Sequence, residues 1–332
     1  MWGWSRSRPT KCLKVGAQAL VWGESSRTWR GRHRYRCLLS PTPAGVVKLS
    51  PIDGNVIDRP ALEERLRSLA GPAKRLVIFG RTLVPDVPRA ITLVLPDLSV
   101  RGTVIQLEEM PDRREEQEAL IRWRLGQEQL VSLAGAKLVW QIFPPRKPHE
   151  GVYMVLVIAI QEAILTEYET ACEAVGLLPQ EVTVASFRLF DLWLKAAGGA
   201  RCLNRDLVWV TVADGGLTCF IIHEGRLVFM RTKLLAGETV QLEDMRNQDW
   251  MDKIVRETGA SIIACQEHCP NLQLKQLVLV TDSDMPVLEG TLGNELGVAT
   301  DQLHWDRVEN LGWSHEGGSK SLATLPVVAG LM

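Results

Sequence analysis

The sequence of 332 residues lacks an apolar run long enough to cross a membrane as a helix. Its longest apolar run, residues 152–160, is less than half of the roughly 20 residues that a spanning helix needs. The first ten residues carry Arg6 and Arg8 but are not followed by the apolar segment of a secretory signal peptide. We therefore expect a cytoplasmic protein.

Cysteine and histidine are few and scattered. The seven cysteines form no Cys-x-x-Cys pair, and an odd number without pairing fits a reducing compartment better than a disulfide scaffold. The nearest approach to a metal motif is Cys265, His268 and Cys269, which offer three ligands where a structural zinc site uses four. No arrangement of Ser, His and Asp, or of Cys and His, indicates a catalytic centre. We expect no metal and no catalytic residues.

The net charge of −1 conceals a basic N-terminal region. The first 50 residues contain ten Lys or Arg and one acid, Glu24. Half of these basic residues form one patch: Arg27, Arg30, Arg32, Arg34 and Arg36. Each basic residue near an anionic membrane contributes about 1 kcal/mol of attraction. The patch predicts a membrane-facing surface without a nucleic-acid partner, and the alternative is an exposed hairpin whose edge is protected by charge.

Periodicity and turn residues divide the chain into alternating strands and helices. Strands are expected at residues 11–22, 34–39, 46–49, 76–79, 90–94, 100–107, 137–143, 152–160, 182–185 and 277–280. Helices are expected at 60–71, 112–130, 162–175, 187–197, 242–265, 286–296 and 322–331. For the first helix, Asp58 is the expected N-cap and Pro60 suits the first turn.

A β-meander is the clearest local feature. In residues 207–231 an apolar run, an Asp214-Gly-Gly turn, a second apolar run and a Glu224-Gly turn follow one another. A similar strand-turn-strand begins near Leu13, which predicts two related halves with a cleft between them. Residues 100–185 read strand-helix-strand-strand-helix-strand, the pattern of a compact inserted α/β unit.

In order and spacing, these segments resemble the PilM family of type IV pilus assembly proteins, which are relatives of FtsA. The resemblance extends over nearly the whole chain, from Met1-Trp-Gly-Trp to Ala329-Gly-Leu331. Its strongest features are Leu107-Glu-Glu-Met-Pro111, Ala119-Leu-Ile-Arg-Trp123, residues 155–160, Gly176-Leu177, Ala185-Ser-Phe187, Glu224-Gly225 and Leu296-Gly297. It implies an α/β, two-lobed actin-like (RNase H-like) ATPase fold with an inserted α/β subdomain. The first lobe would comprise residues 1–99 and 186–205, the inserted subdomain 100–185, and the second lobe 206–332.

The nucleotide motifs of this fold depart from the family pattern. Actin-like ATPases place an Asp-x-Gly turn in each half, because glycine lets backbone N–H groups approach phosphate and aspartate organises Mg²⁺. In the first half this chain reads Leu13-Lys14-Val15-Gly16, with Lys14 or its neighbour at the aspartate position. A cation at that position cannot organise the metal.

The second half and the adenosine-side loop also depart from the family pattern or match it only in one register. Turn-to-turn length slightly favours Val212 at the aspartate position, whereas the alternative register reads Asp214-x-Gly216-x-Thr218. In the adenosine-side loop, where relatives carry glycines, this chain has Asp282 and Asp284. Carboxylates there repel an anionic ligand.

The resemblance, with these departures, implies a non-catalytic scaffold without a cofactor. It would belong to an inner-membrane assembly complex of a type IV pilus or a related secretion or DNA-uptake system, peripheral to that membrane. Its implied partner is the cytoplasmic tail of a PilN-like bitopic membrane protein, with the pilus motor ATPase and platform protein as further partners. The alternative is a slow actin-like ATPase of the same complex that binds ATP and Mg²⁺ through Asp214, Gly216 and Thr218.

Overall fold

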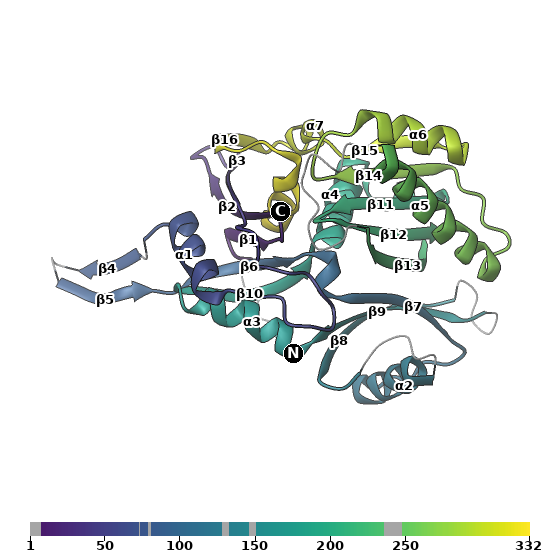
Figure 1. Ribbon diagram of the computed structural model, residues 1–332, viewed down its shortest axis with the longest axis horizontal. Coiled ribbons are helices and arrows are strands. Elements are labelled where there is room, and N and C mark those ends of the chain that lie inside the picture. Colours follow the sequence, from purple (N-terminus) through teal and green to yellow (C-terminus); the bar gives the residue numbers. More distant parts are fainter. Residues whose placement is uncertain (1–7, 73, 79–80, 128–132, 146–150, 236–247) are drawn as a thin grey trace.

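The computed structural model describes residues 8–72, 74–78, 81–127, 133–145, 151–235 and 248–332 (Figure 1). The aromatic-rich start of the sequence and residues 242–247 of the expected helix 242–265 lie outside these ranges. None of the described helices is both long enough and apolar enough to span a membrane.

A six-stranded sheet forms the first lobe, in the order β10-β6-β1-β2-β3-β16. Its strands are β1 (Lys11–Val15), β2 (Ala19–Arg27), β3 (His33–Pro41), β6 (Arg89–Leu95), β10 (Leu177–Val184) and β16 (Ser314–Gly318). The expected strand 11–22 is in fact a hairpin, because the chain reverses where Gly16 N donates to Ala19 O at 3.1 Å. The expected strand 46–49 is reduced to one bridge between Val47 and Val56.

Helices cover both faces of this sheet (Figure 1). They are α1 (Arg59–Ala70), α3 (Glu162–Glu173), α4 (Ala185–Ala196) and α8 (Leu325–Leu331). The start of α1 is confirmed, since Asp58 Oδ1 accepts a hydrogen bond from Ala61 N at 3.0 Å. Because side chains alternate along a strand, Leu13 of β1 packs with α1 and α3, whereas the adjacent Cys12 packs with α4 and α8.

The inserted unit is a three-stranded antiparallel sheet with one helix. It consists of β7 (Arg101–Leu107), α2 (Arg114–Gln127), β8 (Ala136–Phe143) and β9 (Tyr153–Gln161), with strand order β7-β9-β8. Ile121 and Leu125 of α2 are buried on it, whereas Trp123 of the same helix is 59% exposed. The expected range 100–185 also included α3 and β10. In the structure β10 pairs in parallel with β6 of the first lobe. The last strand of the inserted sheet along the chain is therefore β9.

The second lobe is built on a five-stranded sheet in the order β13-β12-β11-β14-β15. Its elements are β11 (Leu207–Ala213), β12 (Gly216–His223), β13 (Arg226–Leu234), α5 (Gln248–His268), β14 (Gln276–Thr281), α6 (Pro286–Leu296), β15 (Ala299–Gln302) and α7 (Trp305–Asn310). The predicted meander is confirmed as β11, β12 and β13. The inserted sheet lies against β13 (Figure 1).

Short elements complete the described chain. They are β4 (Lys74–Ile78) and β5 (Arg81–Val87), which form a hairpin that projects from the body (Figure 1), and the 3-10 turns η1 (Asp97–Ser99), η2 (Gly199–Asn204) and η4 (Leu322–Thr324). After α7 the chain returns to the first lobe. There β16 pairs in parallel with β3, and α8 packs on β1 and β2. The expected second lobe, 206–332, therefore contains two elements of the first.

The two lobes share one apolar core. Cys12 and Tyr35 from the first-lobe sheet belong to the same buried cluster as Trp209 and Phe220 from the second-lobe sheet. Trp193 of α4 lies in this cluster, with its ring centroid 6.0 Å from that of Trp209. The mutual position of the lobes is therefore supported by side-chain packing as well as by the chain connections.

Candidate functional site

The turns of the two hairpins meet where the lobes face each other. Lys14 Nζ, at the end of β1, lies 2.6 Å from Asp214 Oδ2, in the turn after β11. Both residues are buried, with exposed fractions of 3% and 8%. A Cβ atom on Gly16 would overlap Asp214 Oδ1, so glycine is required for this close approach. Lys14, at or next to the position where the sequence comparison expected the first aspartate, thus forms an ion pair between the lobes.

Two further aspartates surround this pair. Asp282, directly after β14, accepts a hydrogen bond from Asp214 N at 3.1 Å. Asp97, at the start of η1, accepts from Ser186 Oγ at 2.7 Å and from Ser186 N at 3.2 Å. Burial raises the pKa of both Asp97 and Asp282 to about 6. Burial alone would lower the pKa of Lys14, but the attraction of Asp214, with Asp282 and Asp97, raises it above its ordinary value.

The three residues expected to bind nucleotide have separate environments. Asp214 faces the cleft and binds Lys14. Gly216 packs under Leu98, since a Cβ there would lie 2.8 Å from Leu98 Cδ1. Thr218 is buried in β12, with its hydroxyl 3.2 Å from that of Thr232. Of the two sequence registers, Asp214 lies at the turn, whereas Val212 is a core residue inside β11.

The arginine patch lies on one hairpin. All five arginines are exposed on β2, β3 and the turn that joins them. Along β3, Arg34 and Arg36 alternate with the buried Tyr35 and Cys37. Arg34 forms an ion pair with Glu316 at 3.0 Å. At the tip, the guanidinium of Arg30 lies 4.5 Å from the ring centroid of Trp29, which is 88% exposed.

The sequence interpretation missed Asp97, because it compared only glycine-containing turns with the family pattern. One signal was available: Asp97 follows the end of a buried parallel strand, where polar groups gather in open α/β sheets. Ser186 belongs to a segment of the family resemblance, which predicted no contact for it. In the structure its backbone N–H and its hydroxyl both donate to Asp97.

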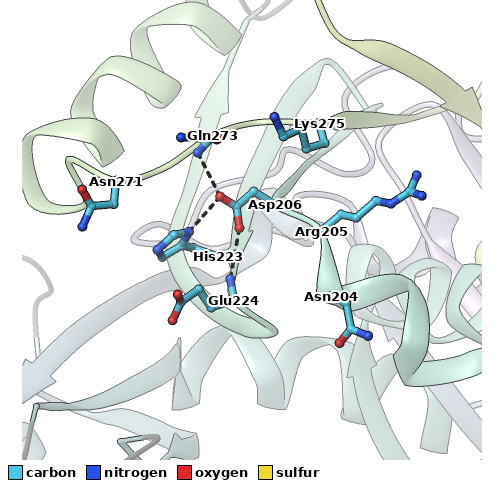
Figure 2. Close-up of a pocket in the computed structure, with 8 residues that line it drawn as sticks. All are labelled: Asn204, Arg205, Asp206, His223, Glu224, Asn271, Gln273 and Lys275. Carbon is cyan, nitrogen blue, oxygen red and sulfur yellow. Dashed lines mark hydrogen bonds and ion pairs between the residues drawn. The ribbon is translucent and has the colours of Figure 1, made fainter.

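A second polar site lies at the opposite end of β11, around Asp206 (Figure 2). This cavity of about 590 Å³ is lined by Asn204, Arg205, Asp206, His223, Glu224, Asn271, Gln273 and Lys275. Asp206 accepts hydrogen bonds from Gln273 N and His223 Nδ1 at 2.9 Å and from Glu224 N at 3.1 Å. Burial would raise the pKa of Asp206, but these hydrogen bonds lower it below its usual value. Asp206 joins three segments of the same lobe.

Neither a protein-family model nor a curated protein sequence matches the chain. Among solved structures, it is similar to the "PilM-PilN type IV pilus biogenesis complex", with a TM-score of 0.72, 18% identity and 98% of each chain covered. The similarity is lower to a Bacteroides thetaiotaomicron protein with an actin-like ATPase fold and unknown function, with a TM-score of 0.44, 10% identity and coverage of 94% and 98%. The cytoplasmic domain of EpsL, from the type II secretion system of Vibrio cholerae, gives a TM-score of 0.39 at 11% identity and coverage of 97% and 94%.

The chain therefore has a two-lobed actin-like α/β fold with an inserted subdomain. Within that class the fold is PilM-like over the full length of both chains. The expected fold class and the family resemblance are confirmed.

Proposed function

We propose that this protein is a non-catalytic scaffold of an inner-membrane assembly complex, in a type IV pilus or a related secretion or DNA-uptake system. The full-length PilM-like fold supports the choice of system. The buried Lys14–Asp214 pair at the meeting point of the lobes is the observation that carries the non-catalytic part. The protein acts on the cytoplasmic side, peripheral to the membrane.

The chemistry of the cleft argues against ATP. A bound Mg²⁺ needs free oxygen ligands and usually keeps several waters. Asp214, the carboxylate that the ATPase alternative would use, is already paired with the ammonium of Lys14. The triphosphate would also lie near Asp282 and Asp97, where like charges repel strongly at low dielectric. Finally, Leu98 would have to move before a phosphate could approach the backbone of Gly216.

Calorimetry with ATP and Mg²⁺ tests this part. We expect no heat of binding at micromolar to millimolar ATP for the full chain. Micromolar affinity that is lost in Asp214→Ala and retained in Glu224→Ala, a change at the other turn of the meander, would establish the ATPase alternative instead.

The proposed partner is the cytoplasmic tail of a PilN-like bitopic protein. The PilM structure to which this chain is similar is a complex with PilN. The exposed surface of the inserted unit is available for the pilus motor ATPase or platform protein. The test is a fluorescence titration of the full chain with a peptide of the cytoplasmic tail of a PilN-like protein from the same organism, with a scrambled peptide as the control. Equal affinity for the two peptides, or no binding of either peptide, would refute this assignment.

The arginine patch is the proposed contact with the anionic membrane surface. Basic residues attract anionic head groups, and an exposed tryptophan such as Trp29 favours the membrane–water interface. Vesicles with 30% phosphatidylserine should bind the wild-type chain and bind the triple variant Arg30→Glu, Arg32→Glu, Arg36→Glu at least tenfold less. A matched triple of exposed arginines elsewhere, Arg65→Glu, Arg101→Glu, Arg256→Glu, should retain most of the binding. Equal loss of vesicle binding in both triple variants would mean that binding depends on the total charge of the protein and not on the arginine patch.

A further inference from the structure

The charged groups at the lobe junction come from four separate segments. Lys14 ends β1 and Asp97 starts η1, and both belong to the first lobe. Asp214 lies in the β11–β12 turn and Asp282 follows β14, and both belong to the second lobe. The ion pair joins Lys14 to Asp214, and a hydrogen bond joins Asp214 N to Asp282. Asp97 also attracts the ammonium of Lys14, so this cation interacts with carboxylates of both lobes.

We infer that Lys14 is a built-in cation that clamps the two lobes together, and that this clamp is linked to protonation of the aspartates around it. The inference deepens the proposed function and rests on it, because it treats the lobe junction as a contact between lobes and not as a nucleotide site. It is independent of the partner, since the clamp acts in the isolated chain. Failure to bind a PilN-like tail would therefore leave it intact.

The geometry makes the clamp strong. The ammonium and the carboxylate are both almost inaccessible to water, and a charge pair at low dielectric interacts far more strongly than at the surface. Breaking the pair would leave uncompensated buried charges, which is more costly than never having placed them there. A small separation of the lobes would do this, because one partner lies on each side.

The clamp also has a pH dependence whose sign follows from the surroundings. The titratable groups that face Lys14 are Asp97, Asp214 and Asp282, and Tyr168 of α3 lies near Asp214 with a pKa raised to about 12 by burial. At neutral pH the carboxylates outnumber the ammonium. As the pH falls through about 6, Asp97 and Asp282 take up protons in the folded state, whereas in the unfolded chain they do so only near pH 4.

Folding stability from Asp97 and Asp282 therefore increases as the pH falls from 8 to about 5. Lys14 has the opposite range: its raised pKa contributes stability that is fully present below its unfolded value and is lost only in strongly alkaline solution. The junction is most stable in mildly acid solution, where Lys14 keeps its charge and the carboxyls of Asp97 and Asp282 take up protons.

The first experiment compares two lysines of the same strand. Lys14→Met keeps an unbranched side chain, one heavy atom shorter, without the charge, and Lys11→Met removes the partly exposed pair with Glu24. In urea unfolding of the full chain, Lys14→Met should raise the unfolding constant by on the order of 100-fold at pH 8 and by less than about tenfold at pH 5.5. Lys11→Met should change it by less than about fivefold at either pH. Equal effects of the two variants, or the same effect of Lys14→Met at both pH values, would refute the clamp.

A second variant keeps the test decisive if Lys14→Met does not fold. Asp282→Asn retains an acceptor for Asp214 N and removes one charge, and Asp284→Asn is the control at the exposed neighbour. The wild type and Asp284→Asn should gain stability from pH 8 to 5.5, and Asp282→Asn should lose about half of that gain. An unchanged gain in Asp282→Asn would contradict the proton linkage.

Hydrogen exchange locates the effect. In Asp282→Asn, or in Lys14→Met where it folds, amide exchange at pH 8 should change in peptides covering both residues 11–22 and residues 207–218. Residues 223–227, at the far turn, should not change. A change confined to one lobe would show that the pair does not join the two.

Discussion

The two turns of the β11–β12–β13 meander have the same backbone and opposite surroundings. Asp214–Gly215 has φ angles of 52° and 78°, and Glu224–Gly225 has 50° and 77°. In each turn, the first residue donates its backbone N–H to an aspartate at 3.1 Å, Asp282 in one case and Asp206 in the other. Both are two-residue turns with positive φ at both positions, the kind that matches the twist of a hairpin.

Their environments separate them. Asp214 is buried and paired with Lys14 across the lobes, whereas Glu224 is exposed. Burial raises the pKa of Asp282, whereas three hydrogen bonds from two other segments hold that of Asp206 below its usual value. The same turn conformation, with an acid followed by glycine, therefore makes a junction between lobes at one end of β12 and a tie within one lobe at the other. The role of such a turn depends on which segments are brought opposite it.

The largest expected effect is at the cleft turn. Asp214→Ala leaves the buried ammonium of Lys14 without its nearest partner, and we expect a loss of about 3–5 kcal/mol in the free energy of unfolding. Glu224→Ala, the same change at the far turn, should alter it by less than about 0.5 kcal/mol. Urea unfolding at pH 7 measures both. Comparable losses would remove the distinction between the turns.

A smaller effect is expected at the tie beneath the far turn. Asp206→Asn keeps the shape but removes the charge that accepts three hydrogen bonds, for a loss of about 1–2 kcal/mol at pH 7. Because the folded pKa of Asp206 is lowered, its contribution is present above about pH 4 and disappears as the pH falls below that value. The urea midpoints of the wild type and Asp206→Asn should differ at pH 7 and agree at pH 3. Asp284→Asn, the exposed control, should match the wild type throughout.

Packing distinguishes the cleft as well. Gly216→Ala places a methyl group against Leu98, and overpacking of this kind costs about 1–3 kcal/mol. A thermal unfolding cycle with Leu98→Val tests the cause, since the double variant should lose less than the sum of the single variants. Strict additivity would mean that Leu98 does not cover the turn.

The smallest effect tests the shared backbone directly. Glu224→Gly relieves the positive φ at the far turn and should stabilise the protein by about 0.5 kcal/mol. Asp214→Gly makes the same backbone change, but it should destabilise because the ion pair is lost. Differential scanning fluorimetry resolves the opposite signs. A gain in both variants would mean that the ion pair contributes little.

Local elements were predicted well because their signals are local. Asp58, Pro60 and the spacing of Leu62 and Leu66 identified α1, and the two acid-glycine turns identified the meander. The hairpin at Gly16 was missed, because residues 11–22 were taken as one strand and Gly16 was not read as a turn. The sheet that β10 joins was also missed, since its sequence does not distinguish pairing with β6 from pairing inside the inserted unit.

The candidate site could be predicted only in part. The cation at position 14 and the carboxylate at 282 were identified as separate departures from a nucleotide motif, and the carboxylate at 214 as the residue that fits this motif in the alternative register. Their contact was not predicted, because Lys14 and Asp214 lie in different lobes, and periodicity carries no information on which turns meet. Asp97 was not considered, although it lies in the same cluster of charges.

The sequence by itself determined the β-meander and most of the helices, because backbone preference, capping and side-chain alternation act over a few residues. It also led to the expectation that Lys14 or its neighbour lies where actin-like ATPases carry a metal-organising acid. Only the tertiary structure decided that this lysine has a buried partner, that β16 returns to the first lobe, and that one acid-glycine turn joins lobes while the other faces solvent. The physical reason is that burial and charge pairing arise between segments distant in the chain, and burial is what gives a charge its strength.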